Sequence, residues 1–170
     1  GRPLAIHLKV DTGMHQQGFL WRDRMAVMKL LKTLPTKARV EGLFTHLAEA
    51  KKPKNGARTR KQIAEFQQWK GLFQAEGHRV ITHVSATGGT LVYPEAYEDM
   101  VRVGIGFYGI WPSDEVRVYR ADLVLHPTLA WKTIVSEVKR VAKGESVGYD
   151  FTETLKQDSQ IAIIPIGYWH

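Results

Sequence analysis

The feature that most constrains the fold is the alternation of strand-like and helix-like segments through the first two thirds of the 170 residues. Apolar stretches typical of buried strands occupy residues 4–10, 40–47, 79–84 and 100–108. Helical apolar spacing occupies residues 21–34 and 58–76, with Gly77 as the expected C-cap of the second, and a short helix is predicted at 88–93. Strands that alternate with helices form a parallel sheet, either open or closed into a barrel.

The pattern changes after Pro112, beyond which no good helix is predicted. Residues 123–129, 131–141 and 160–166 are predicted strands. In the second of these, two sets of side chains alternate roughly along the strand, which is typical of antiparallel structure. We therefore expect a second, mostly β domain. The transition lies within about 112–124, and we divide the chain into domains of residues 1–118 and 119–170.

Composition narrows the class of protein. No apolar run reaches the ~18 residues of a membrane-spanning helix, and the absence of cysteine excludes disulfides and thiolate metal sites. We expect a cytoplasmic protein with no membrane span and no metal. The net charge of +7 would suit a nucleic-acid partner, but we interpret the densest basic cluster as a solvated loop and helix face and expect no such partner. That cluster comprises Lys51, Lys52, Lys54, Arg58, Arg60 and Lys61.

Polar and ionisable groups follow four successive predicted strands, where parallel α/β proteins place their chemistry. Singly, none is specific. His46 is more often a packed histidine than a functional one, and Lys9 in a buried strand would be satisfied by an ion pair with Asp11 or another carboxylate. The Thr87-Gly88-Gly89 segment is either an anion cradle or a plain helix cap. Together with Arg102, these groups indicate a cation, an imidazole and a phosphate-sized cradle at one edge of a sheet.

Five segments of the chain, in order, resemble the alanine racemase family. They are residues 7–14 (HLKVDTGM), 42–48 (GLFTHLA), 101–109 (VRVGIGFYG), 147–149 (VGY) and 164–168 (IPIGY). The resemblance covers essentially the whole chain. It implies α/β plus β architecture, with the C-terminal half of a (β/α)₈ TIM barrel followed by the start of a mostly β domain. It also implies that the Schiff-base lysine lies upstream of residue 1, so that the chain alone is expected to be inactive.

The resemblance implies the roles of three catalytic residues. Arg102 would hold the pyridine nitrogen of the cofactor, pyridoxal 5′-phosphate, and keep that nitrogen unprotonated because arginine does not give up its proton. His46 would contact the cofactor-binding Arg102 and link it to Tyr149. Tyr149 would be one of two bases and would serve the site of the partner subunit in a homodimer.

The resemblance also implies the phosphate site. Thr87, with the backbone N–H groups of Gly104 and Ile105, would bind the phosphate. Lys9 matches a lysine that is carbamylated in some members of the family. Gln16 departs from the pattern, because the family has an arginine there that contacts the cofactor, and an amide carries no charge.

The implied function is the interconversion of L- and D-alanine, which supplies D-alanine for peptidoglycan. Two alternatives share the fold: a racemase acting on serine or other amino acids, and a non-catalytic barrel remnant that only binds pyridoxal phosphate. A nucleic-acid-binding module is a further alternative and predicts steeply salt-dependent binding.

Overall fold

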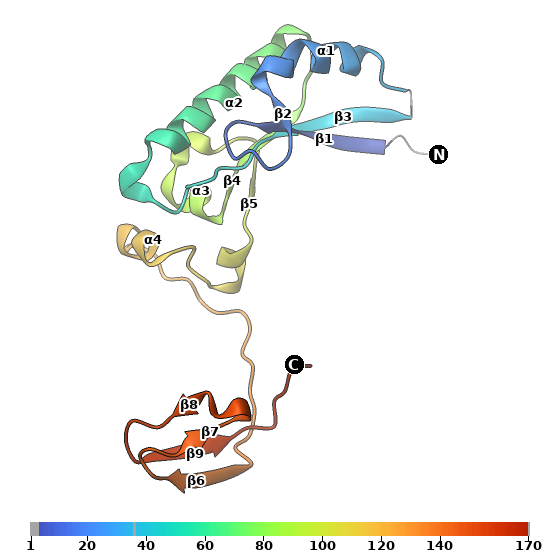
Figure 1. Ribbon diagram of the computed structural model, residues 1–170. Coiled ribbons are helices and arrows are strands. Elements are labelled where there is room, and N and C mark those ends of the chain that lie inside the picture. The colour runs from blue at the N-terminus through green and yellow to red at the C-terminus, as the bar shows by residue number, and fades with distance from the viewer. Residues whose placement is uncertain (1–3, 36, 170) are drawn as a thin grey trace. The chain divides into compact units, whose positions relative to one another are not determined.

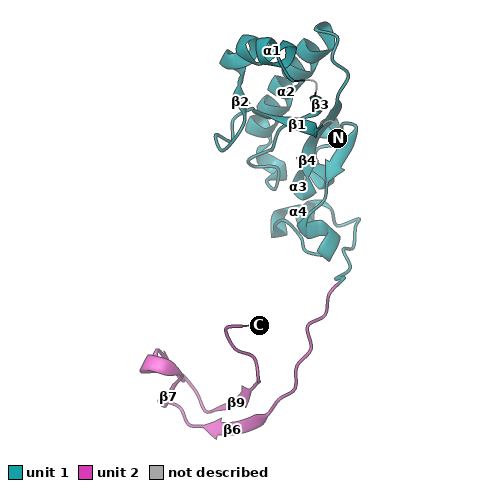
Figure 2. Ribbon diagram, turned by 90° about the vertical axis from the view of Figure 1, so that its right-hand side faces the viewer, with its two compact units in different colours: residues 1–128 teal, residues 129–170 magenta. Residues whose placement is uncertain are grey.

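The computed structural model describes residues 4–35 and 37–169, and it divides into two compact units. The first extends to Thr128 and the second begins at Leu129 (Figure 2). The domain boundary between residues 118 and 119 stays a prediction. Within the described ranges, no helix is both long and apolar enough to cross a membrane.

The first unit is built on a five-stranded sheet in which every pair of neighbours is parallel. The order is β2-β1-β3-β4-β5, so four of the strands follow one another in chain order. Helices α1 and α2 lie over the sheet on the same side (Figure 1). The strands are β1 (Leu4–Asp11), β2 (Phe19–Leu20), β3 (Ala38–Phe44), β4 (Ile81–Ala86) and β5 (Met100–Arg102). The predicted parallel sheet is confirmed.

All but one of the α-helices of this unit fall near their predicted places. The α-helices are α1 (Arg24–Lys32), α2 (Ala57–Ala75), α3 (Thr87–Val92) and α4 (Asp114–Tyr119). Short 3₁₀ turns are η1 (Trp21–Asp23), η2 (Pro53–Asn55), η3 (Pro94–Ala96) and η4 (Ile105–Tyr108). Helix α2 ends at Ala75 with Glu76 as its C-cap, one residue before the predicted C-cap Gly77. Gly77 follows with φ +81°, and the next N–H, of His78, donates to the Phe73 carbonyl at 2.9 Å.

The core lies between the sheet and α2. Val10, Leu43 and Val84 come from three adjacent strands, and their side chains are fully buried. Helix α2 buries its apolar face at residues 66, 69 and 73, a helical spacing that supplies two phenylalanines and a tryptophan. This packing leaves the carboxyl ends of the strands outside the core, where the loops that follow them gather.

The predicted strand at residues 100–108 is confirmed only for residues 100–102 and is wrong for residues 103–108. Strand β5 ends at Arg102, and η4 follows it. The reason is a contact from elsewhere in the chain: the backbone N–H groups of Gly104 and Gly106 donate to the Thr87 hydroxyl at 3.1 and 3.2 Å. Gly109, with φ +78°, then closes the turn.

Helix α4 was not expected, because no helix was predicted beyond Pro112. Its N-cap is Ser113, whose hydroxyl accepts a hydrogen bond from the backbone N–H of Val116 at 3.3 Å. Asp114 and Glu115 add negative charge to the first turn, where the helix dipole favours it. Val116 is fully buried and anchors this six-residue helix to the core.

The second unit is antiparallel β structure, as predicted. Strand β6 (Glu137–Val141) pairs with β9 (Ser159–Ile163), and β7 (Ser146–Val147) pairs with β8 (Glu153–Thr154). The 3₁₀ turn η5 (Tyr149–Phe151) lies between β7 and β8. The predicted strand at residues 123–129 does not form, and of the predicted strand at 131–141 only residues 137–141 do. Ser136 still donates its backbone N–H to the carbonyl of Ile163 at 2.8 Å, but residues 123–135 pair with no strand among the described residues.

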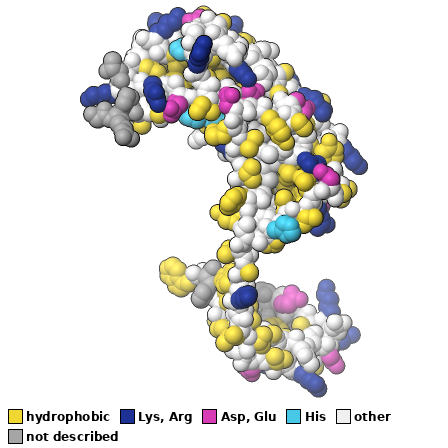
Figure 3. Space-filling view, turned by 180° about the vertical axis from the view of Figure 1, so that it is seen from behind, with side chains coloured by type: hydrophobic (Ala, Val, Ile, Leu, Met, Phe, Trp, Pro, Cys, Tyr) yellow, Lys and Arg dark blue, Asp and Glu magenta, His cyan; other side chains and the backbone are white. Residues whose placement is uncertain are grey.

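Charged side chains are dispersed over the surface seen in Figure 3 rather than gathered in one patch. Figure 3 shows Lys and Arg side chains spread over the visible face among hydrophobic and polar ones. All six side chains of the basic cluster at residues 51–61 are exposed, as a solvated face predicts. Two of them are paired: Lys52 with Glu49 at 3.0 Å and Arg60 with Glu95 at 3.1 Å.

Candidate functional site

Arg102, the last residue of β5, is the centre of a network of strand-end groups. Its Nη2 donates to the backbone carbonyls of Thr45 at 2.8 Å and Val84 at 3.1 Å. Its Nη1 donates to Nδ1 of His83 at 2.5 Å, and its guanidinium carbon lies 5.3 Å from the ring centroid of Phe44. Burial lowers the pKa of Arg102, but a guanidinium stays charged at neutral pH. The cation is therefore fixed in direction by carbonyls from two neighbouring strand ends.

His83 is a member of this network that the sequence reasoning missed. Because a guanidinium has only donors, Nδ1 of His83 must accept, and its ring proton must be on Nε2. Nε2 lies 2.7 Å from Nδ1 of His7, so His83 donates and His7 accepts. Burial, then the charge of Arg102 and the nearby His7, lower the pKa of His83 to about 4. The ring is neutral at physiological pH. The sequence carried one signal that His83 could belong to the site: it is an ionisable residue inside the predicted buried strand at residues 79–84.

His46 lies on the other side of the same cation. Its Nδ1 accepts from Nη2 of Arg102 at 3.3 Å, so the structure brings these two predicted residues together. Burial, followed by the charges of Arg102 and Lys9, lowers the pKa of His46. A neutral imidazole that accepts from an arginine has its proton on Nε2. Tyr149 belongs to the second unit, where its side chain is 88% exposed, and its link to His46 stays a prediction.

The segment around Thr87 forms a second part of the site. The Thr87 hydroxyl accepts from the N–H groups of Gly104 and Gly106, which leaves its own proton to donate. The side chain is 6% exposed. A Cβ on Gly106 would lie 2.6 Å from Cγ2 of Thr87, so only glycine allows this approach, whereas a Cβ on Gly104 would meet nothing within 4 Å. The structure thus brings Thr87 and Gly104 together beside open space, with the N–H of Ile105 next in the chain.

The proposed ion pair between Lys9 and Asp11 does not form. Oδ1 of Asp11 instead accepts the backbone N–H groups of residues 13–15 at 2.9–3.0 Å. Although burial opposes ionisation, these bonds and the adjacent His15 hold the pKa of Asp11 below its usual value. Lys9 is half-buried on β1. Gln16, the departure from the family pattern, is exposed in the loop between β1 and β2.

Two family models match the chain. Residues 1–112 match the N-terminal domain of alanine racemase and residues 128–170 match its C-terminal domain. The alanine racemase of Symbiobacterium thermophilum is 38% identical over 169 residues, which are 99% of this chain and 44% of that protein. Alanine racemase 1 of Oceanobacillus iheyensis is 35% identical over 165 residues, which are 96% of this chain and 43% of that protein.

Solved structures give the same result. Alanine racemase from Streptomyces coelicolor superposes with a TM-score of 0.82 at 29% identity, covering 98% of this chain and 44% of that one. The Bacillus anthracis enzyme with bound L-Ala-P gives a TM-score of 0.81 at 30% identity, with coverage of 98% and 43%. The chain spans less than half the length of these relatives. Because one family model alone matches residues 1–112 of the 170, the chain belongs to the alanine racemase family.

Proposed function

We propose that this chain supplies the Arg102 side of the active site of a pyridoxal-phosphate-dependent alanine racemase. Its parallel sheet would be the C-terminal half of the (β/α)₈ barrel, and residues from about 119 onward would begin the β domain. The observation that carries the proposal is the arrangement of Arg102, which two strand-end carbonyls and two imidazoles hold in one orientation. The family membership supports it.

The residues present fit this cofactor. Arg102 offers only donors, so it suits an unprotonated ring nitrogen and would leave that nitrogen without a proton. The spare proton of the Thr87 hydroxyl, with the N–H groups of Gly104 and Ile105, suits a phosphate, and the open space beside Gly104 gives it room. When bound, pyridoxal phosphate withdraws electrons from the α-carbon of an amino acid and makes its α-proton acidic.

The protein groups would then handle the proton and the cofactor's orientation. His46 would stay neutral and accept from Arg102 through Nδ1, which keeps the cation directed toward the ring nitrogen. Tyr149 would act as one of two bases and exchange a proton at the α-carbon from one face of the substrate. Its exposed phenol is compatible with service in the site of a partner subunit, and we propose a homodimer.

Lys9, half-buried and close enough to lower the pKa of His46, would contribute positive charge unless it is carbamylated. We also propose that the enzyme works in the cytoplasm.

The test is a chirality-resolved assay of the gene product that carries these residues, supplied with pyridoxal phosphate and L-alanine. We expect D-alanine to form, and we expect Tyr149→Phe to lower the rate at least ~100-fold, the lower bound for a general base. Absence of D-alanine with cofactor bound would contradict the proposal. Faster turnover of L-serine than of L-alanine would favour a racemase with another substrate.

A further inference from the structure

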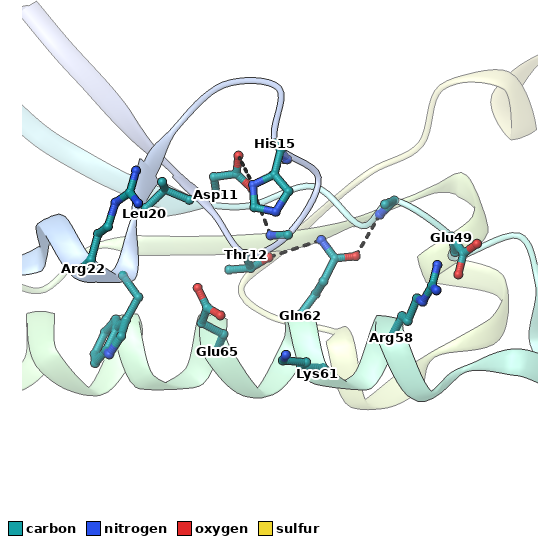
Figure 4. A pocket seen from close by; sticks show the side chains of 13 residues that line it. Asp11, Thr12, His15, Leu20, Arg22, Glu49, Arg58, Lys61, Gln62 and Glu65 are labelled. Carbon is teal, nitrogen blue, oxygen red and sulfur yellow. Dashed lines mark hydrogen bonds and ion pairs between the residues drawn. The ribbon is translucent and has the colours of Figure 1, made fainter.

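Gln62 is a buried amide on the side of α2 that faces the strand ends. Its side chain is 5% exposed and points toward the segments that follow β1 and β3 (Figure 4). Its Oε1 accepts the backbone N–H of Ala48 at 2.9 Å, and its Nε2 donates to the backbone carbonyl of His46 at 3.1 Å. One amide therefore satisfies a C=O and an N–H two residues apart, as a neighbouring strand would.

The segment that Gln62 holds has left the sheet. The ladder between β3 and β4 reaches Phe44, and the last bond of this kind joins the N–H of Thr45 to the carbonyl of His83 at 3.3 Å. Backbone groups that leave a sheet while still partly buried require other partners. Among the side chains, only an amide offers a carbonyl acceptor and an N–H donor in one plane. A carboxylate would lack the donor, and a thioether would lack both.

The same segment faces Arg102. Nη2 of Arg102 donates to the Thr45 carbonyl at 2.8 Å and to Nδ1 of His46 at 3.3 Å. Gln62 also reaches the segment through a hydroxyl relay, since its Nε2 lies 3.4 Å from Oγ1 of Thr12, and Thr12 is hydrogen-bonded to Oγ1 of Thr45 at 2.9 Å. Both groups that orient Arg102 from this side therefore lie on backbone that Gln62 holds.

We propose that Gln62 is a positioning residue that fixes residues 45–48 and, through them, sets the orientation of His46 and Arg102. What His46 and Arg102 then do rests on the proposed function, but the positioning itself rests on the contacts above. A helix residue 16 positions after His46 would thus determine the geometry of the site through the backbone of residues 45–48.

The test measures the pKa of His46 by ¹⁵N NMR of the histidine side chains in the 170-residue chain, with His46→Asn assigning the signal. In the wild type we expect His46 to titrate below ~6.5, because burial, Arg102 and Lys9 oppose its protonation. Gln62→Met keeps the approximate volume but removes every hydrogen bond. We expect it to raise the pKa of His46 toward the ordinary value, as the ring moves away from Arg102 and into water.

Two control variants separate positioning from general stability. Gln68→Met alters an exposed amide on the same helix and should leave His46 unchanged. Ile63→Val loosens the buried core one residue away from Gln62 and should lower the melting temperature without moving the pKa of His46. Thr12→Val removes the hydroxyl relay from the opposite side without replacing a residue of α2, and we expect a smaller upward shift in the pKa of His46.

The proposal is overturned if folded Gln62→Met titrates His46 as the wild type does, or if Ile63→Val shifts it equally. If Gln62→Met does not fold, Thr12→Val decides. An upward shift in the pKa of His46 supports the proposal, and an unchanged pKa of His46 overturns it. An absorbance titration with pyridoxal 5′-phosphate of the gene product that carries these residues separates the two hypotheses. A shifted His46 without cofactor binding would contradict the proposed function and leave the positioning intact.

Discussion

The Gly42→Ala variant tests whether the hydrogen-bonded side chains of His7, His83 and Arg102 are packed as the structure shows. A Cβ built on Gly42 would lie 2.5 Å from Cε1 of His7 and closer still to Cγ and Nδ1 of the ring. Gly42 is not among the glycines with positive φ, so alanine is compatible with its backbone. In the folded state the Gly42→Ala variant therefore acts by a steric clash that displaces the His7 ring from His83.

The expected cost follows from three contributions. Overpacking a close-packed site costs about 1–3 kcal/mol, with the exposed side of His7 giving the ring room to move and favouring the lower value. Loss of the 2.7 Å bond to His83 adds about 0.5–1.5 kcal/mol. The reduced entropy of the unfolded chain offsets about 0.4–1 kcal/mol. We expect the free energy of unfolding to fall by about 1–2 kcal/mol.

Urea unfolding followed by circular dichroism measures this change. The matched control is Gly71→Ala, at an exposed site inside α2 where an added Cβ meets nothing within 4 Å. That variant should gain about 0.5–1 kcal/mol from helix propensity. Adding His7→Ala to Gly42→Ala should remove most of the extra cost, as a double-mutant cycle shows coupling. A Gly42→Ala protein as stable as Gly71→Ala would refute the packing argument.

Three further predictions concern stability. Burial lowers the pKa of His83 to about 4, so the stability that its neutral ring contributes is complete above the unfolded pKa of ~6.5 and is lost as pH falls toward 4. The free energy of unfolding from urea melts should be up to about 2 kcal/mol lower at pH 5 than at pH 7, with a smaller difference in His83→Asn. Thr59 has a buried hydroxyl without a hydrogen-bond partner in the described chain, so Thr59→Val should raise stability by about 1 kcal/mol in thermal melts; a loss of stability would show that the hydroxyl is satisfied. Ser113→Ala removes the cap of α4 and should cost about 1 kcal/mol, whereas an unchanged melt would mean that the cap contributes nothing.

Much of the first unit follows from local pattern. Continuous apolar runs and helical spacing predicted the strands at residues 4–10 and 79–84 and the helix at 58–76, because buried elements must alternate in this way to form a core. The end of β5 was not predictable locally, since the Thr87 hydroxyl 17 residues away turns the chain at Gly104.

The second unit shows the complementary limit. Residues 123–129 are apolar enough for a strand, but a strand also requires a hydrogen-bonding partner, and the described chain provides none there. Helix α4 was missed for the opposite reason: at six residues it is too short to show periodicity, and a single serine cap starts it.

The site was predicted in part. Arg102, His46 and Thr87 stand at strand ends, where chemistry was expected, and the structure joins the first two directly. His83 and Gln62 were not predicted as site residues. Their contacts depend on sheet register and on a long-range approach of α2, neither of which a single sequence specifies.

The most direct test of the central claim is the affinity of the gene product that carries these residues for pyridoxal 5′-phosphate, measured by absorbance titration. If Arg102 and Thr87 hold the cofactor, Arg102→Leu and Thr87→Val should each weaken binding at least ~10-fold, since each removes a hydrogen bond to a charged or ring acceptor. Gln68→Met should bind as the wild type does. Wild-type affinity in both Arg102→Leu and Thr87→Val would contradict the assignment of this site.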